Sequence, residues 1–182
     1  MNILLFGLSN VGKSVSGKLL AVHLNYTFYD LDDEVKKDQH TTLDKFVSTG
    51  TLLERDSVRC RILNHIVCKP GNKVVAVAPL SYTKEIQYLF SSPDVICIEL
   101  TDTKENIFNR LVFSDENDVI YKDDDYKEQH RDHYLYEIQA DLNWYGSVYS
   151  DIKNRFNIAG MPDEKAVAEM IDQFHFYENM GK

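Results

Sequence analysis

A chain of 182 residues, 43% of them hydrophobic, is long enough to bury a core, and we expect one domain over residues 1–182. A net charge of −9 without a local basic patch argues against a nucleic-acid partner, and three cysteines without C-x-x-C spacing argue against a disulfide framework or a zinc site. No apolar run reaches the roughly eighteen residues of a membrane helix, and no basic leader precedes the first apolar segment, so we expect a soluble, cytoplasmic protein without a membrane partner.

The chain begins with an apolar strand over residues 2–6, which leads into the loop GLSNVGKS, a match to G-x-x-x-x-G-K-S/T at every fixed position. Gly7 and Gly12 permit backbone turns in which successive N–H groups point into one concavity that accepts phosphate oxygens. Lys13 supplies a positive charge for the β and γ phosphates, and the Ser14 hydroxyl is a hard oxygen ligand for Mg²⁺. The motif predicts a phosphate-binding loop; the alternative is a glycine-rich turn that holds no nucleotide.

A helix and an acidic strand end follow this loop. Apolar residues at helical spacing predict a helix over residues 13–25, and residues 26–31 have the composition of a short strand. Asp30, Asp32 and Asp33 come at the end of that strand, where a parallel sheet carries its ligands. These carboxylates are candidates for the reaction site, with an acidic cap on the following helix as the alternative.

The rest of the chain alternates helices with strands. Helices are predicted over residues 41–48, 53–67, 83–90, 103–113, 134–149 and from Pro162 onward, and strands over residues 73–78, 95–100 and 155–158. In the helix over 53–67, the inward residues are Val58, Ile62 and Ile66, and the residues on other faces are Arg55, Arg59 and Arg61. The acidic, weakly periodic segment 114–133 is either mobile over the site or a solvated insertion. The alternation predicts an α/β fold with a parallel sheet and helices on both of its faces.

The first two motifs together resemble the shikimate kinase family of small P-loop kinases. GLSNVGKS and the following NYTFYDLD are similar to the family's G-x-x-G-x-G-K-S and L-x-x-x-F-x-D-x-D signatures, and the register of the later elements is similar over nearly the whole chain. The resemblance implies a three-layer P-loop kinase fold with a five-stranded sheet in the order 2-3-1-4-5. It also implies ATP and Mg²⁺ as cofactors, a substrate-binding region over 31–67 and a lid over 114–133.

The resemblance assigns roles to individual residues. The expected nucleotide-binding residues are Gly7, Asn10, Val11, Gly12, Lys13, Ser14, Val15 and Arg110. The expected catalytic residues are Lys13 and Asp32, and Asp32 also holds the substrate hydroxyls and orients or deprotonates the attacking one. Asp30 is expected to support Mg²⁺ beside Ser14. Arg55, in a segment similar to the family's G-E-x-x-F-R, is expected to bind the substrate carboxylate; the alternative for Arg55 is a surface arginine, and for Arg110 a helix-ending cation.

Two departures from the family pattern lie on the acceptor side. Residues 76–81, AVAPLS, stand where the family has a glycine triplet, and Pro79 has no N–H to donate. Tyr145 stands where the family pattern R-x-x-x-Y puts an arginine. The lid segment is also poor in cations, with Lys122, Lys127 and Arg131 among many acids.

Two functions are consistent with this pattern. The first is an ATP-dependent small-molecule kinase that transfers the γ-phosphate to a hydroxyl of shikimate or of a related small hydroxy acid or polyol. The second is a nucleotide-binding regulator or degenerate kinase without phosphotransfer, which the altered acceptor side motivates. The expected partners are therefore ATP or ADP and a small hydroxyl acceptor. Trp144, the only tryptophan, either lines the acceptor pocket or has a core or lid-hinge role.

Overall fold

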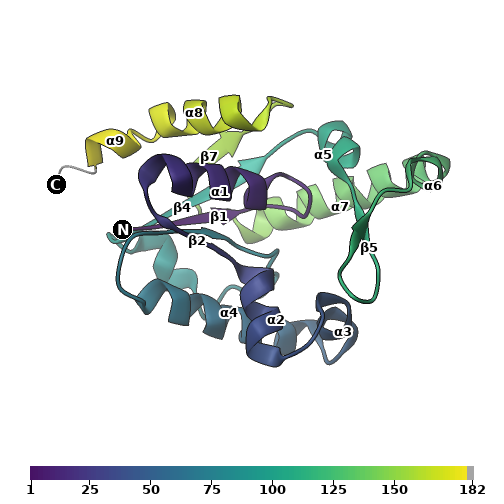
Figure 1. Cartoon of the computed structure of the whole chain (residues 1–182), viewed down its shortest axis with the longest axis horizontal. Helices are drawn as coiled ribbons and strands as arrows, with labels where there is room; N and C mark the ends of the chain where they lie inside the picture. Colours follow the sequence, from purple (N-terminus) through teal and green to yellow (C-terminus); the bar gives the residue numbers. More distant parts are fainter. Residues whose placement is uncertain (180–182) are drawn as a thin grey trace.

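The computed structural model describes residues 1–179, so residues 180–182 of the predicted domain lie outside the described part of the chain. Figure 1 shows the arrangement of its helices and strands. In chain order these are β1 (Asn2–Phe6), α1 (Lys13–Leu24), β2 (Thr27–Asp30), α2 (Leu31–Gln39), α3 (Leu43–Ser48), α4 (Leu52–Cys68), β3 (Lys73–Ala76), the 3₁₀ helix η1 (Gln87–Ser91), β4 (Val95–Thr101), α5 (Lys104–Arg110), β5 (Phe113–Ser114), β6 (Ile120–Tyr121), α6 (Asp124–Gln129), α7 (Arg131–Val148), β7 (Asn154–Asn157), α8 (Asp163–Gln173) and α9 (Phe176–Asn179).

Five strands form a parallel sheet in the order β2-β3-β1-β4-β7, and β5 and β6 form a separate antiparallel hairpin. Because β7 is the fifth strand of the sheet along the chain, the predicted order 2-3-1-4-5 is confirmed. All of the connections in the sheet run through helices, as parallel pairing requires. The carboxyl ends of β1, β2 and β3 consequently lie at one edge, where the phosphate loop and the acidic residues meet.

The central strand β1 is buried on both faces, and its side chains alternate between two cores. Ile3 and Leu5 pack into the core that contains α1 and α8, whereas Leu4 and Phe6 pack into the core that contains α4. Figure 1 shows α1 and α8 on one side of the sheet and α4 on the other. A strand buried on both faces reads as a continuous apolar run, which is why this element was predictable from its sequence.

Three elements differ from the prediction. Helix α2 was not predicted, because only Leu31 and Val35 on it are buried and the rest of its nine residues are polar; it begins directly after Asp30, whose side chain accepts the N–H of Asp32. The predicted helix over 83–90 is reduced to the short 3₁₀ helix η1, and α5 ends at Arg110 rather than continuing to residue 113. Phe113 instead begins the β5–β6 hairpin.

Two further features are the hydropathy of the helices and the state of the cysteines. Among residues 1–179, no helix is both long enough and apolar enough to cross a membrane. Cys60 and Cys97 are buried and Cys68 is exposed, and all three are free thiols.

Candidate active site

The phosphate loop connects β1 to α1, and its two fixed glycines hold backbone conformations that other residues resist. Gly7 has φ +134° and a Cβ there would lie 2.5 Å from the carbonyl oxygen of Leu100. Gly12 has φ +112° and occupies the N-cap position of α1. The motif therefore needs glycine at these positions for steric reasons, and its N–H groups surround the start of a twelve-residue helix.

The Lys13 side chain is buried inside the curve of this loop. Its Nζ donates hydrogen bonds to the carbonyl oxygens of Gly7, at 2.9 Å, and Leu8, at 2.5 Å. Burial lowers the pKa of Lys13 to about 8, although the carboxylates of Asp32 and Asp30 act in the opposite direction. Lys13 is thus mostly charged at pH 7, and a bound phosphate would compete with these two carbonyl oxygens for its ammonium group.

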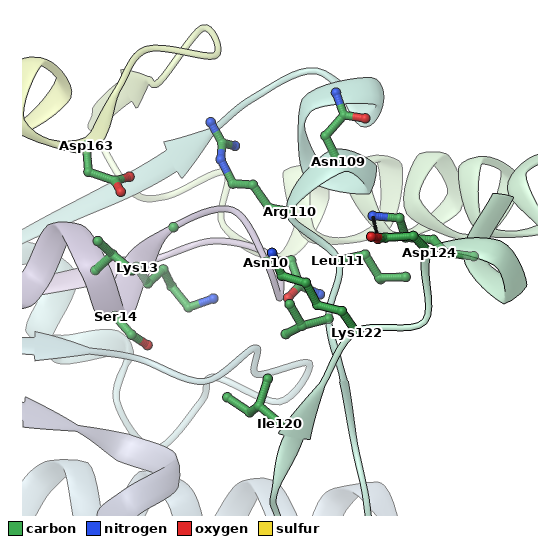
Figure 2. Close-up of a pocket in the computed structure, with 14 residues that line it drawn as sticks. Asn10, Lys13, Ser14, Asn109, Arg110, Leu111, Ile120, Lys122, Asp124 and Asp163 are labelled. Atoms are coloured by element: carbon green, nitrogen blue, oxygen red, sulfur yellow. Dashed lines mark ion pairs between the residues drawn. The ribbon is translucent and has the colours of Figure 1, made fainter.

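A cavity of about 540 Å³ opens over the loop on the side of α5 (Figure 2). Six of the eight predicted nucleotide-binding residues line it: Asn10, Gly12, Lys13, Ser14, Val15 and Arg110. The two others do not, because Gly7 lies at the loop's beginning and Val11 is buried in the core. The volume suits a nucleotide-sized ligand.

Arg110 is both a cavity-lining residue and a helix-ending cation. It is the last residue of α5, and its guanidinium donates to Asp102 Oδ2 at 2.7 Å. Burial acts to raise the pKa of Asp102, but hydrogen bonds from Asn106, Arg110 and two backbone N–H groups together lower it. Asp102 is therefore ionised at neutral pH, and it fixes the orientation of the Arg110 guanidinium at the cavity.

The hairpin and α6 complete the far side of this cavity. Ile120, Lys122, Asp124 and Lys127 line it, so the predicted lid segment lies over the nucleotide side of the loop (Figure 2). The tip of the hairpin also reaches the α3 helix, where the Asp118 carboxylate accepts the N–H groups of Leu43, at 2.7 Å, and Asp44, at 3.3 Å.

A second, smaller cavity of about 160 Å³ brings the phosphate loop to the acidic end of β2. It is lined by Ser9, Asn10, Lys13, Ser14, Asp30, Asp32 and residues 76–79. The Ser14 hydroxyl donates to Asp30 Oδ2 at 2.5 Å, and Asp30 Oδ1 accepts the N–H of Asp32 at 3.1 Å. Asp30 is thus the helix cap that the alternative interpretation expected, and the same carboxylate also contacts the phosphate loop.

Burial raises the pKa of Asp32, and the positive charge of Arg59 opposes that rise. Its side chain remains 31% exposed. A carboxylate in this position can accept a proton more readily than one in bulk water.

Serine and aspartate oxygens at this point fit a magnesium ion. Mg²⁺ binds proteins through one or two oxygen ligands and takes the rest of its octahedral coordination from phosphates and water. Within residues 1–179, no cluster of three or more His, Cys, Asp or Glu side chains could hold a metal by itself. Ser14 and Asp30 therefore match a metal that arrives with a nucleotide rather than a metal held by the protein alone.

The structure corrects the prediction that Arg59 lies on an outward face of its helix. Arg59 is buried, with its guanidinium 3.6 Å from Asp32 Oδ1, 3.5 Å from Asp56 Oδ1, and over the ring of Phe46. Buried residues on α4 recur at positions 56, 59, 60 and 63, the spacing of a helical face. That periodicity is the signal by which the sequence could have identified Arg59.

Arg55, predicted to bind the substrate carboxylate, lies in a different cavity. Its Nη1 donates to the carbonyl oxygens of Thr49 and Gly50, at 3.2 and 2.9 Å. It lines a cavity of about 480 Å³ with Phe46 and Glu54, and it does not line the cavity that Asp30 and Asp32 share. Its role stays a prediction, and Arg59 is the arginine that contacts Asp32.

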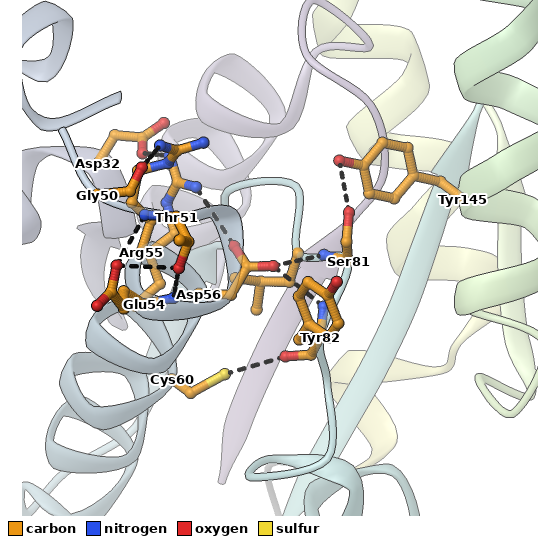
Figure 3. Close-up of polar contacts among 12 residues, drawn as sticks. Asp32, Gly50, Thr51, Glu54, Arg55, Asp56, Cys60, Ser81, Tyr82 and Tyr145 are labelled. Atoms are coloured by element: carbon orange, nitrogen blue, oxygen red, sulfur yellow. Dashed lines mark hydrogen bonds and ion pairs between the residues drawn. The ribbon is translucent and has the colours of Figure 1, made fainter. Parts of the chain in front are cut away.

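The loop after β3 directs its N–H groups to the protein's own side chains. Leu80 N donates to the Tyr149 hydroxyl at 2.9 Å, and the N–H groups of Ser81 and Tyr82 donate to Asp56 Oδ2 at 2.9 and 3.0 Å. Figure 3 shows the Asp56 side chain extending from α4 to this loop. The N–H groups of residues 80–82 are therefore already used within the protein.

Two aromatic residues of α7 contact the same loop. The Ser81 hydroxyl lies 3.5 Å from the Tyr145 hydroxyl (Figure 3), and Trp144 Nε1 donates to Ser81 Oγ at 3.3 Å. Trp144 is 58% exposed, which excludes the core role among the alternatives. Its contact with Ser81 places it beside the loop after β3.

Comparisons with known proteins agree with this architecture. The shikimate kinase family model matches residues 9–173. A shikimate kinase from Rippkaea orientalis is 36% identical over 67 residues, a match that spans 36% of this chain and 35% of that relative's length. The structure of a shikimate kinase from Bacteroides thetaiotaomicron is similar at 19% identity and a TM-score of 0.79, and the match covers 96% of this chain and 98% of that one. The structure of a shikimate kinase from Acinetobacter baumannii in complex with shikimate is similar at 15% identity and a TM-score of 0.73, and the match covers 95% of this chain and 92% of that one.

A gluconokinase structure from Sinorhizobium meliloti is also similar, at 13% identity and a TM-score of 0.60. The match covers 97% of this chain and 96% of the gluconokinase chain. The fold is thus common to kinases named for different acceptors. Because the family model extends over nearly all of the described residues, the chain belongs to the shikimate kinase family, whose members are ATP-dependent kinases that use Mg²⁺.

Proposed function

We propose that this protein transfers the γ-phosphate of ATP to a hydroxyl group of shikimate or of a related small hydroxy acid or polyol. The observation that carries the proposal is the cavity in which Lys13 and Ser14 of the phosphate loop face the carboxylates of Asp30 and Asp32. Phosphoryl transfer requires positioning, charge neutralisation and one group that orients the nucleophile, and this cavity contains a residue for each requirement.

In this proposal Lys13 and the loop N–H groups bind the phosphates, and Arg110 lies beside the nucleotide. Ser14 and Asp30 would hold Mg²⁺, which neutralises phosphate charge when bound. Asp32 accepts the proton of the attacking hydroxyl, and Arg59 keeps Asp32 in place. Residues 31–67 then form the acceptor region and residues 114–133 the lid.

The test is ATP-to-ADP conversion with Mg²⁺ and the purified protein, with and without a panel of hydroxy acids and polyols that includes shikimate. We expect turnover that depends on an acceptor, and a loss of about 10²–10⁴-fold in kcat for Asp32→Asn. Asp33→Asn is the matched control, because its carboxylate contacts Lys36 on the surface and lines neither cavity.

A second candidate, a nucleotide-binding regulator without phosphotransfer, is favoured by the loop at 80–82 and by Tyr145, which depart from the family on the acceptor side alone. Absence of turnover with every acceptor, together with a higher melting temperature in ATP, would support it. If ATP raises neither the melting temperature of the protein nor that of Lys13→Ala, both candidates fail.

A further inference from the structure

We propose that the acceptor of this chain is a neutral polyol, recognised through its hydroxyl groups, and that the same molecule with a carboxylate is a poorer substrate. The inference rests on the proposed function and narrows its substrate class. It follows from the charges and hydrogen-bonding groups that surround Asp32, Ser81 and Tyr145.

Arg59 is the cation that contacts Asp32, and two carboxylates already balance its positive charge. Arg59 lies between Asp32 and Asp56, at 3.6 and 3.5 Å, and Asp56 is fully buried. These three side chains carry a net charge of −1. The other cation at the cavity, Lys13, belongs to the phosphate loop. An acceptor carboxylate would therefore enter a region with no unmatched cation among the described residues that line the cavity or contact Asp32, and like charges repel strongly where water is scarce.

The side chains next to Asp56 on the loop after β3 and on α7 are neutral. Ser81 and Tyr145 offer hydroxyls and Trp144 offers an indole N–H. Burial raises the pKa of the Tyr145 hydroxyl, and the negative charges of Asp141 and Asp56 act in the same direction. The Ser81 hydrogen bond and the positive charge of Arg59 oppose this rise without cancelling it. Tyr145 therefore stays protonated and offers a neutral hydroxyl.

Unpartnered buried atoms indicate what a ligand must supply. Arg59 is more than nine-tenths buried, and its Nε lacks a hydrogen-bond partner. Asp32 Oδ1 faces the Arg59 guanidinium at 3.6 Å, and it too is buried without a hydrogen bond. A hydroxyl both donates and accepts, so adjacent hydroxyls of a polyol can pair with a guanidinium N–H and a carboxylate oxygen together. A carboxylate only accepts and leaves the Asp32 oxygen unpaired, which costs free energy in a buried site.

The experiment compares matched acceptor pairs that differ in charge. Shikimate is measured against its methyl ester, and gluconate against sorbitol, as kcat/KM at pH 7 with saturating Mg·ATP. We expect the neutral member of at least one pair to be used at least tenfold more efficiently. Equal or better use of the acid in both pairs overturns this inference and leaves the proposed function standing. No transfer to any of the four overturns this inference, and no transfer to any acceptor of the wider panel overturns the proposed function as well.

A charge variant provides an independent readout. Tyr145→Arg adds a cation beside Ser81, and we expect it to shift the acid-to-neutral ratio of kcat/KM by at least tenfold toward the acid. Tyr136→Arg makes the same charge change on the same helix at a residue that is 75% exposed, and we expect no shift. Because the ratio compares two substrates on one protein sample, partial unfolding of a variant cancels. An unchanged ratio in Tyr145→Arg overturns the inference.

Discussion

Replacing Arg59 by methionine removes a buried guanidinium and keeps much of its aliphatic volume. Asp56 and Asp32 then lose the cation that contacts both. Breaking a buried ion pair by removing one partner costs about 3–5 kcal/mol. Because the N···O distances here are 3.5 and 3.6 Å and Asp32 is 31% exposed, we expect a lower cost, about 2–3 kcal/mol. In a chain of 182 residues this lowers the melting temperature by about 4–12 °C.

The assay is urea unfolding of the two proteins at pH 7 and pH 5. Burial already raises the pKa of Asp32, and Arg59 limits that rise, so the variant raises this pKa further above its unfolded value. A carboxyl group with a raised folded pKa binds more protons in the folded state, and its destabilising effect diminishes as pH falls. The stability deficit should therefore be smaller at pH 5 than at pH 7.

Arg61→Met is the matched control, because Arg61 lies on the same helix and pairs with Asp38 at the surface. Exposed pairs contribute about 0–1 kcal/mol. If Arg59→Met loses no more stability than Arg61→Met, or if its stability deficit grows at pH 5, the assignment of Arg59 as a cation shared by Asp32 and Asp56 is refuted.

Three other predictions concern the phosphate loop, the hairpin and the thiols. With the pKa of Lys13 at about 8, Mg·ADP affinity measured by calorimetry should fall by up to tenfold per pH unit above that value, whereas Lys13→Arg should show a flat profile; parallel profiles would contradict this. Asp118→Ala should cost about 1 kcal/mol and speed hydrogen exchange at Leu43, and unchanged exchange would mean that the contact is not formed in solution. Cys68 should react with a thiol reagent in the native protein, and the two buried cysteines, whose pKa burial raises to about 12, only on unfolding; three fast thiols would exclude this packing.

The sheet and the phosphate loop were predictable because their signals are local. The apolar runs of the central strands and the fixed glycines of the loop depend on nearest neighbours in sequence, whereas the order of the strands followed from the family resemblance. Helix α2 was not predicted, because its position depends on contacts with other segments rather than on a local sequence signal. It has only two buried apolar residues, Leu31 and Val35, and its position is determined by the Asp30 cap and by packing against α4.

The acceptor side was less predictable because its contacts join segments far apart in sequence. Asp32, Arg59 and Ser81 come from three different segments, and Tyr145 approaches them from a fourth. The similarity of GTLLER to a family motif drew the prediction to Arg55, whereas the burial pattern of α4 brings the arginine one turn later to Asp32. A motif that has lost some of its fixed positions identifies the helix that carries the site arginine, but not which arginine of that helix reaches the site.

The central position of β1 has a consequence for synthesis of the chain. Leu4 pairs on one side with Val75 and on the other with Cys97, so the strand that carries the phosphate loop gains its first neighbour with β3 and its second only with β4. Pairings this distant in sequence form slowly, and chains fold as their segments become available. The phosphate loop leaves the ribosome before both of the strands that flank β1, and a nascent chain that ends before β4 should not retain nucleotide.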